Sequence, residues 1–159
     1  TLILANGDKY VGDWVDNKRN GKGIYTWANG NRYVGDWVDG KLIGKGTLTY
    51  PNGYKYEGDW VDNERSGFAI MTSPNGDKYE GDYLNDSPNG KGTITFLNGN
   101  KYTGDIADGN LNGKGTLTFI NGDKYVGDFV DGVFHGKGTV TLENGKKLRG
   151  KWLNGNQVN

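Results

Sequence analysis

Two short segments in which hydrophobic and polar residues alternate recur along the chain. In the first, at residues 32–37, Tyr33, Gly35 and Trp37 fall on one face, and the residues between them fall on the other. In the second, at residues 44–50, threonines alternate with apolar residues. Short alternating segments rich in β-branched and aromatic side chains predict β-strands.

The strand pair recurs every 23 residues. One tyrosine marks each unit, with leucine in the seventh place: Tyr10, Tyr33, Tyr56, Tyr79, Tyr102, Tyr125 and Leu148. A fixed period of this length indicates a repeat architecture. We therefore predict one array over residues 1–159. It has a partial unit at 1–9, full units starting at 10, 33, 56, 79, 102 and 125, and a partial unit at 148–159.

An Asn-Gly pair separates the second segment of each unit from the next first segment, as at Asn52 and Gly53, which predicts a hairpin. A two-residue turn would place Thr49 opposite Tyr56, and a three-residue loop would place Leu48 there. Pro51 before Asn-Gly fits a type I turn in which Gly53 takes a positive φ, and so favours the second register.

This register places the tyrosines, tryptophans and apolar residues on one face and lysine, threonine and aspartate on the other. Gly35 then lies opposite Gly46, which leaves a bare patch that an aromatic ring can cover. The fold class is all-β: an elongated single-layer antiparallel β-meander of tandem 23-residue hairpin repeats. Fourteen strands at about 4.8 Å spacing would span roughly 65 Å if flat.

Composition narrows the class of protein. The chain has 29 glycines but only 3 prolines, without a three-residue period, and 13% aromatics, which excludes collagen and disorder. Zero net charge gives no general attraction to nucleic acid, and there is no cysteine. We find no long apolar stretch or signal peptide, and expect a cytoplasmic location, at the membrane periphery if the chain binds lipid.

The pattern Y-x-G-D-W-x-D-G-x-x-x-G-K-G at residues 33–46 resembles the membrane occupation and recognition nexus (MORN) repeat, and the resemblance covers the whole chain. It implies a β-meander without catalytic residues of its own. Members of that family act as protein-binding scaffolds or as modules beside enzymes such as lipid kinases and methyltransferases. Phospholipid binding has also been attributed to them. Phe68 and Ala69 depart from the pattern.

Candidate chemistry is sparse. His135 is the only histidine and stands where other units mostly carry asparagine, so we interpret it as a surface variant. The aspartates of the Gly-Asp pairs recur with the fold, whereas an active site is normally singular. They are expected to face Lys22, Lys45, Lys91, Lys114 and Lys137 across the polar face. The segment at residues 108–113 begins like a calcium loop but has Phe119 in place of the bidentate glutamate. We expect no catalytic residue, cofactor or metal site.

Two surfaces are candidates for binding. The first is an aromatic groove with variable loop residues at its rim, predicted to accept a helix or extended segment of a partner protein: Tyr10, Trp14, Tyr33, Trp37, Tyr56, Trp60, Leu42, Ile43, Leu111, Val133 and Phe134. The second is a basic run, either protecting a sheet edge or contacting an anionic lipid: Lys146, Lys147, Arg149 and Lys151.

The sequence thus favours a non-catalytic interaction scaffold. The alternatives are a peripheral module that binds anionic phospholipid headgroups and a regulatory arm of a larger enzyme. The first residues, "TLIL", read as an unprotected edge strand, so we also expect either a preceding repeat or self-association through that N-terminal edge.

Overall fold

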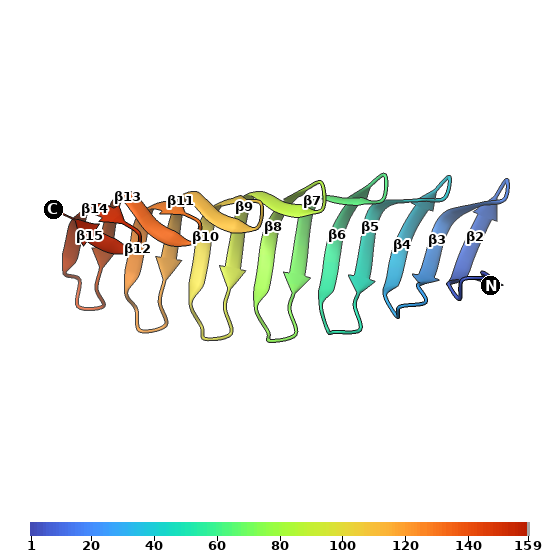
Figure 1. The fold of residues 1–159 in the computed structure, drawn as a ribbon, viewed down its shortest axis with the longest axis horizontal. Coiled ribbons are helices and arrows are strands. Elements are labelled where there is room, and N and C mark those ends of the chain that lie inside the picture. The colour runs from blue at the N-terminus through green and yellow to red at the C-terminus, as the bar shows by residue number, and fades with distance from the viewer. Residues whose placement is uncertain (159) are drawn as a thin grey trace. The chain divides into compact units, whose positions relative to one another are not determined.

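The computed structural model describes residues 1–158, and within them it contains fifteen strands and no helix, so no helix there could cross a membrane. The strands follow one another in chain order in one open antiparallel sheet (Figure 1). The all-β meander is confirmed, with one more strand than the fourteen predicted. The strands are β1 Leu2–Ile3, β2 Lys9–Val15, β3 Lys18–Thr26, β4 Arg32–Val38, β5 Lys41–Thr49, β6 Lys55–Val61, β7 Glu64–Thr72, β8 Lys78–Leu84, β9 Ser87–Thr95, β10 Lys101–Ala107, β11 Asn110–Thr118, β12 Lys124–Val130, β13 Val133–Thr141, β14 Lys147–Leu153 and β15 Asn156–Val158.

The chain divides into two compact units. The first unit comprises Thr1–Pro74 with Tyr83–Asp86, and the second comprises Asn75–Asp82 with Ser87–Asn159. Both are built from the same hairpin repeat. The assignment of residues 1–159 to one array stays a prediction.

The Asn-Gly turns have the predicted geometry. The amide of Gly53 donates to the Tyr50 carbonyl at 2.9 Å, as in a type I turn, and Gly53 has a φ of 93°. Leu48 pairs with Tyr56, which confirms the three-residue loop and the separation of the two faces. The Asn52 side chain accepts the Tyr54 amide at 3.3 Å and holds the turn.

A second row of turns joins the two strands within each repeat. Asp39 and Gly40 have φ values of 49° and 84°, and they connect β4 to β5 with Val38 opposite Lys41. Positive φ at both central residues is the mark of a type I′ turn, which matches the twist of an antiparallel hairpin. The Asp-Gly pairs carried this signal in the sequence, although only the Asn-Gly pairs were interpreted as turns above.

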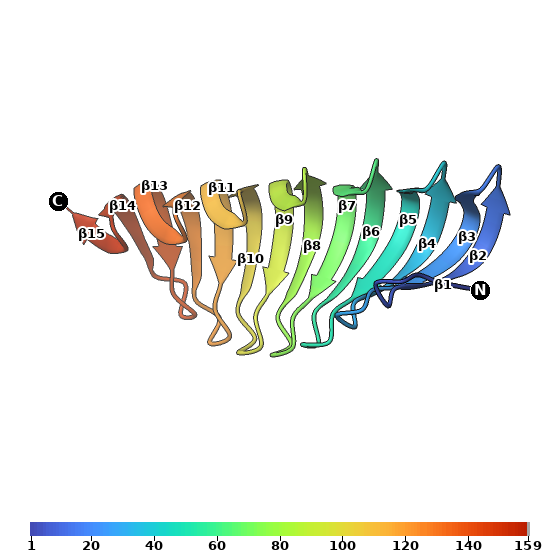
Figure 2. The same cartoon turned by 45° about the vertical axis from the view of Figure 1, so that its right-hand side comes forward.

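A bulge explains another glycine of the motif. Gly35 of β4 pairs with Gly46 of β5, but the next residue, Asp36, pairs with Ile43. Two residues of β5, 44 and 45, therefore have no partner in β4. One of them, Gly44, has a φ of 61°, which glycine adopts without steric cost. Such a bulge increases the local bend, and Figure 2 shows the strands of the first unit as curved ribbons.

The tyrosine rings lie over the paired glycines, as predicted. A Cβ atom added to Gly35 would stand 2.6 Å from Tyr33 Cζ, and one added to Gly46 would stand 2.5 Å from the same atom. The Tyr33 hydroxyl donates to the Asp36 carbonyl at 3.3 Å. Five further tyrosines make the equivalent bond to the carbonyl three residues on: Tyr10, Tyr56, Tyr79, Tyr102 and Tyr125.

Hydrogen bonds outside the strand ladder join neighbouring repeats within each unit. In the first unit the amide of Gly40 donates to the Arg19 carbonyl at 2.9 Å, and that of Asn63 donates to the Leu42 carbonyl at 3.1 Å. In the second unit the amide of Gly132 donates to the Leu111 carbonyl at 3.0 Å. Each turn is therefore fixed to the repeat before it, so the repeats stabilise their neighbours in sequence.

We predict that Gly35→Ala lowers the free energy of unfolding by about 1 to 3 kcal/mol. The added methyl would meet the backbone of the next strand, 2.7 Å from Gly46 Cα, as well as the Tyr33 ring. Gly46→Ala is the matched control and should cost less, because the three atoms nearest to its methyl all belong to the Tyr33 side chain, which can shift more easily than backbone. The third repeat already carries alanine there, as Ala69 opposite Gly58. Urea unfolding of both variants measures the difference, and equal losses would contradict the explanation.

We also predict that stability falls at alkaline pH. Burial raises the pKa of Tyr102 to about 12, and it raises the pKa of Tyr33 and Tyr56 as well. The ordinary tyrosine pKa is about 10, so these phenols ionise first in the unfolded chain. Their stabilisation is complete below about pH 10 and is lost as the pH rises toward about 12. Urea unfolding from about pH 8 to about pH 11 should show this decline, and Tyr102→Phe should reduce it. A constant free energy of unfolding over that range would contradict the prediction.

Candidate binding surfaces

Most of the aromatic residues predicted to line the groove are packed in the core of the first unit. Tyr33 and Tyr56 are 0% exposed, and Trp37 is 2% exposed, whereas Trp14 is 42% exposed. Tyr33 contacts Trp37 and Trp60 edge to face, with ring centroids 5.5 Å and 5.2 Å apart. Tyr10 and Trp60 are buried in the same way. The open aromatic surface is thus smaller than expected, because each ring is covered by its neighbours.

A groove nevertheless remains on this face of the first unit. It encloses about 460 Å³, and the predicted groove residues Trp37, Leu42 and Trp60 line it. Further aromatic and polar side chains complete the lining: Tyr25, Trp27, Tyr50, Asn63 and Asp86. Trp60 Nε1 donates to the Gly46 carbonyl at 3.4 Å, which fixes that indole. The groove therefore combines a rigid aromatic floor with polar groups at its margin.

Arg19 and Arg65 also line the groove, and neither was predicted from the sequence. The Arg19 guanidinium lies 4.4 Å from the centroid of the Trp37 ring, within cation–π range. Arg65 Nε donates to Asp86 Oδ1 at 2.9 Å. Arg19 lies 23 residues before Leu42 and Arg65 lies 23 residues after it, so all three occupy the same position of the repeat. The 23-residue period could therefore have identified both arginines as groove residues.

The charge of Arg65 is secured by its surroundings. Burial by itself lowers the pKa of the guanidinium, but the hydrogen bond and negative charge of Asp86 outweigh it and raise the pKa. Arg65 also contacts the Tyr56 and Tyr83 rings, with its Cζ 5.6 Å from each centroid. This end of the groove therefore presents a fixed cation beside aromatic rings.

The predicted rim residues are divided between the two units. Leu42 itself is 6% exposed and pairs with Trp37. Ile43 is half-buried beside it. Leu111, Val133 and Phe134 belong to the second unit, so the groove of the first unit is formed without them.

Phe134 differs most from the expectation of a free rim residue. It stacks on Tyr125 with ring centroids 3.7 Å apart and also contacts Phe129 and Trp152 edge to face. Replacing Phe134 would disturb the packing of the second unit, so it offers no clean test of binding. Its partner-binding role stays a prediction.

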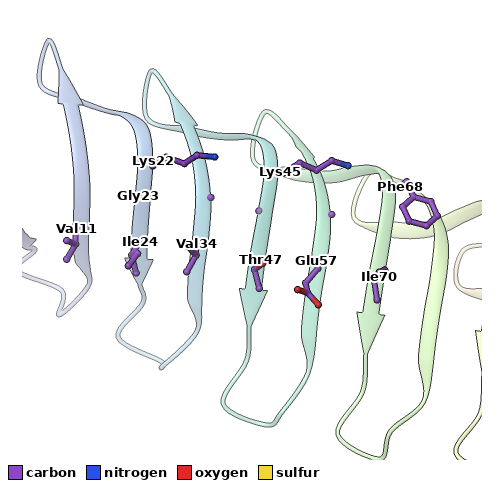
Figure 3. A pocket seen from close by; sticks show the side chains of 13 residues that line it. Val11, Lys22, Gly23, Ile24, Val34, Lys45, Thr47, Glu57, Phe68 and Ile70 are labelled. Carbon is purple, nitrogen blue, oxygen red and sulfur yellow. The ribbon is translucent and has the colours of Figure 1, made fainter.

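The opposite face of the first unit carries a larger hollow of about 730 Å³. Figure 3 shows Val11, Ile24 and Val34 on three neighbouring strands, where the register pairs each with the next. Phe68 and Ile70 add apolar surface from β7. This face was predicted to carry lysine, threonine and aspartate. Valine and isoleucine alternate with the charged residues along its strands, and this pattern could have predicted the apolar hollow.

Lysine–aspartate pairs cross the polar face of each unit, as predicted. Lys45 Nζ lies 2.6 Å from Asp59 Oδ1 in the first unit, and Lys114 Nζ lies 2.7 Å from Asp128 Oδ1 in the second. Lys22 with Asp36 and Lys91 with Asp105 form the equivalent pairs. The hydrogen bond from Lys114 lowers the pKa of Asp128.

The same aspartates also stabilise the bulge. Asp128 Oδ2 accepts the Lys137 amide at 3.1 Å, and Asp105 Oδ2 accepts the Lys114 amide at 2.8 Å. Asp105 and Asp128 thus each serve a lysine pair and the bulge, which favours aspartate at this repeat position. Residues 1–158 contain no group of three or more acidic or histidine side chains placed to hold a metal ion.

The basic run is only partly brought together. Lys147, Arg149 and Lys151 alternate along β14 and share one face, whereas Lys146 lies in the preceding turn. The register adds Lys137, which was expected to face an aspartate but lies directly opposite Lys151. The two facts needed to place Lys137 there were both visible in the sequence: the cross-strand pairing and the replacement of aspartate by Lys151.

The first residues form only a short edge strand. β1 pairs with β2 through Leu2 with Tyr10 and Ile3 with Lys9. Ile3 is 71% exposed, and Leu2 and Leu4 line a hollow of about 320 Å³ with Tyr10. Self-association through this edge stays a prediction.

Comparison with solved structures finds TCP domains of low sequence identity. The TCP domain of SAS-4 from Drosophila melanogaster, solved with a proline-rich motif of Ana2, is 16% identical, with 95% of this chain and 88% of that chain covered and a TM-score of 0.40. The TCP10c domain of Drosophila melanogaster Sas-4 is 15% identical, with 89% and 97% covered and a TM-score of 0.43. The TCP10 domain of Danio rerio CPAP is 15% identical, with 94% and 81% covered and a TM-score of 0.31. TM-scores this low carry no inference about function.

A search of curated protein sequences finds no significant match. A family model, by contrast, matches most of the chain. The MORN repeat model matches six consecutive segments, at residues 10–32, 33–53, 56–78, 79–101, 102–124 and 125–147. These boundaries follow the 23-residue period and the tyrosines that begin each hairpin. The chain therefore belongs to the MORN repeat family.

Proposed function

We propose that this chain is a non-catalytic interaction scaffold that binds a segment of a partner protein in the aromatic groove of its first unit. The observation that carries the proposal is the groove of about 460 Å³, floored by Trp37 and Trp60 and bordered by Arg19, Arg65 and Asn63. Tryptophan, tyrosine and arginine are the residues that most often dominate the binding energy of protein interfaces.

The groove also suits binding because its walls are already ordered. Trp37 and Trp60 are held edge to face against Tyr33, and Arg19 Nη2 donates to the Gly40 carbonyl at 3.0 Å. A partner would therefore meet side chains that lose little rotational freedom on binding, which favours affinity. The arginines supply donors for the carbonyl groups of a bound segment, and the half-buried Trp27 ring supplies apolar contact.

The two alternatives have less support. Binding of anionic lipid headgroups would rest on the basic residues of β14 alone, since the whole chain has zero net charge. A role as the regulatory arm of a larger enzyme would still use the groove as its contact surface. The proposed scaffold would act in the cytoplasm.

Peptides selected from a random display library against the native chain provide the test. We expect the enriched peptides to change the tryptophan fluorescence, because four of the five tryptophans lie in the first unit and three line the groove. Arg19→Ala should weaken their binding by about 1 to 3 kcal/mol in titration calorimetry. Arg32→Ala is the matched control, since Arg32 is an exposed arginine of the same unit whose neighbour Tyr33 faces the aromatic side.

The thermal midpoint of each variant shows whether the chain remains folded. Selected peptides that bind Arg19→Ala and native chain equally, or that lose as much affinity with Arg32→Ala, would overturn the groove assignment. The hollow on the opposite face, around Val11, Ile24 and Val34, would then be the next surface to test.

A further inference from the structure

The row of lysine–aspartate pairs is interrupted on the polar face of the second unit. Lys91 faces Asp105, and Lys114 faces Asp128, but in the next strand pair Lys137 faces Lys151. Like charges directly opposite each other on a sheet are destabilising. The chain therefore maintains a local repulsion where the two preceding repeats of this unit place an attraction.

Arg149 increases this concentration of positive charge. It lies two residues from Lys151 on β14, hence on the same face, and is opposite Thr139 of β13. Within residues 1–158, none of Lys137, Arg149 and Lys151 forms an ion pair with a carboxylate. Asp128, which contacts the Lys137 backbone, already binds Lys114 through Oδ1 and the Lys137 amide through Oδ2.

The three cations border a hollow. It encloses about 480 Å³ and is lined by Val126, Thr139 and the backbone of two glycines in addition to the cations. No carboxylate lines it. A concave surface bordered by charges of one sign raises the local concentration of ligands of the opposite sign, here anions. This surface is termed the cation hollow below and comprises Lys137, Arg149 and Lys151.

We propose that the cation hollow binds an extended acidic segment of a partner protein, one that carries aspartate or glutamate at alternate positions. The charge of the hollow requires an anion, and the arrangement of the cations selects its form. Arg149 and Lys151 of the cation hollow stand two residues apart on one strand, and Lys147 continues this spacing outside the hollow. Alternate residues of a strand are about 6.8 Å apart, and an extended segment presents its alternate side chains at the same spacing.

The pairs elsewhere in the unit show the contact that such a segment would make. Lys114 Nζ approaches Asp128 Oδ1 to 2.7 Å from the adjacent strand. An aspartate of the partner would give Lys137 and Lys151 the carboxylate that each lacks. The regular spacing of the cations along one strand matches an extended segment, so we place lipid among the outcomes to be excluded.

The inference is independent of the aromatic groove. The groove belongs to the first unit, and the cation hollow belongs to the second. Substitutions in one leave the residues of the other unchanged, so either proposal can fail without the other.

Fluorescence anisotropy with three labelled peptides tests the proposal on the whole chain. In the first peptide aspartate and threonine alternate, in the second asparagine replaces aspartate, and in the third the same aspartates form one block. We expect the alternating acidic peptide to bind most tightly and the asparagine peptide not to bind. Because exposed charges are screened by salt, affinity for the first should fall about fivefold between about 0.05 and about 0.3 M sodium chloride.

Lys151→Asp provides the sharpest variant, because it places an aspartate opposite Lys137 as in the other repeats. It should raise the melting temperature and weaken the alternating peptide about tenfold. Lys101→Asp is the matched control: it makes the same charge change on a strand of the same unit, where Lys101 faces threonines on both sides. It should leave peptide affinity unchanged.

Three results would overturn the proposal. One is equal affinity for the alternating and block peptides, since a diffuse charge would then explain binding. Another is an equal loss with Lys101→Asp. The third is co-sedimentation with phosphatidylserine vesicles without binding of the alternating peptide, which would assign the cation hollow to a lipid surface. If Lys151→Asp does not fold, Arg149→Gln replaces it with the same expected direction.

Discussion

The contact between each tyrosine ring and a bare pair of glycines is the interaction on which this structure depends. In a sheet without a packed second layer, apolar side chains have little to bury against, and a domain normally solves this with two layers. Here the Tyr33 ring covers Gly35 and Gly46, and its hydroxyl is anchored on the Asp36 carbonyl. The sheet thus packs the aromatic rings against its own backbone, and the 0% exposure of Tyr33 shows how completely the ring is covered.

The remaining features of the repeat follow from that contact. The bulge at Gly44 bends the second strand of its repeat. In the second unit, Asp105 and Asp128 each accept an amide of the bulge while also pairing with a lysine. Because one aspartate both accepts the bulge amide and pairs with a lysine, charges of opposite sign face each other on the polar face and none of them is buried. Surface pairs of this kind contribute little each, about 0 to 1 kcal/mol, so their value lies in fixing the register of successive repeats.

Function can then arise where the repeat is varied without disturbing the tyrosine–glycine contact. On the aromatic face the variable position carries Arg19, Leu42 and Arg65 in successive repeats and forms the margin of the groove. On the polar face the last aspartate position carries Lys151 and forms the cation hollow. The two proposed surfaces are thus single-position changes on an otherwise uniform scaffold, which is how repeat proteins diversify binding.

The sequence by itself determined the strands, the 23-residue period, the Asn-Gly turn and the pairing of Gly35 with Gly46, because these depend on local alternation and turn chemistry. It also placed lysines opposite the aspartates of the polar face, as seen for Lys45 and Asp59. Only the tertiary structure showed that Trp37 and Trp60 are buried and that Phe134 stacks on Tyr125. The exposure of a side chain depends on how far the bulge bends its strand and on which ring of the next repeat covers that side chain. The alternation of apolar and polar residues predicts neither. The two binding surfaces also required the tertiary structure. Arg19 and Arg65 border one groove, and Lys137 lies opposite Lys151, only because neighbouring repeats pack side by side.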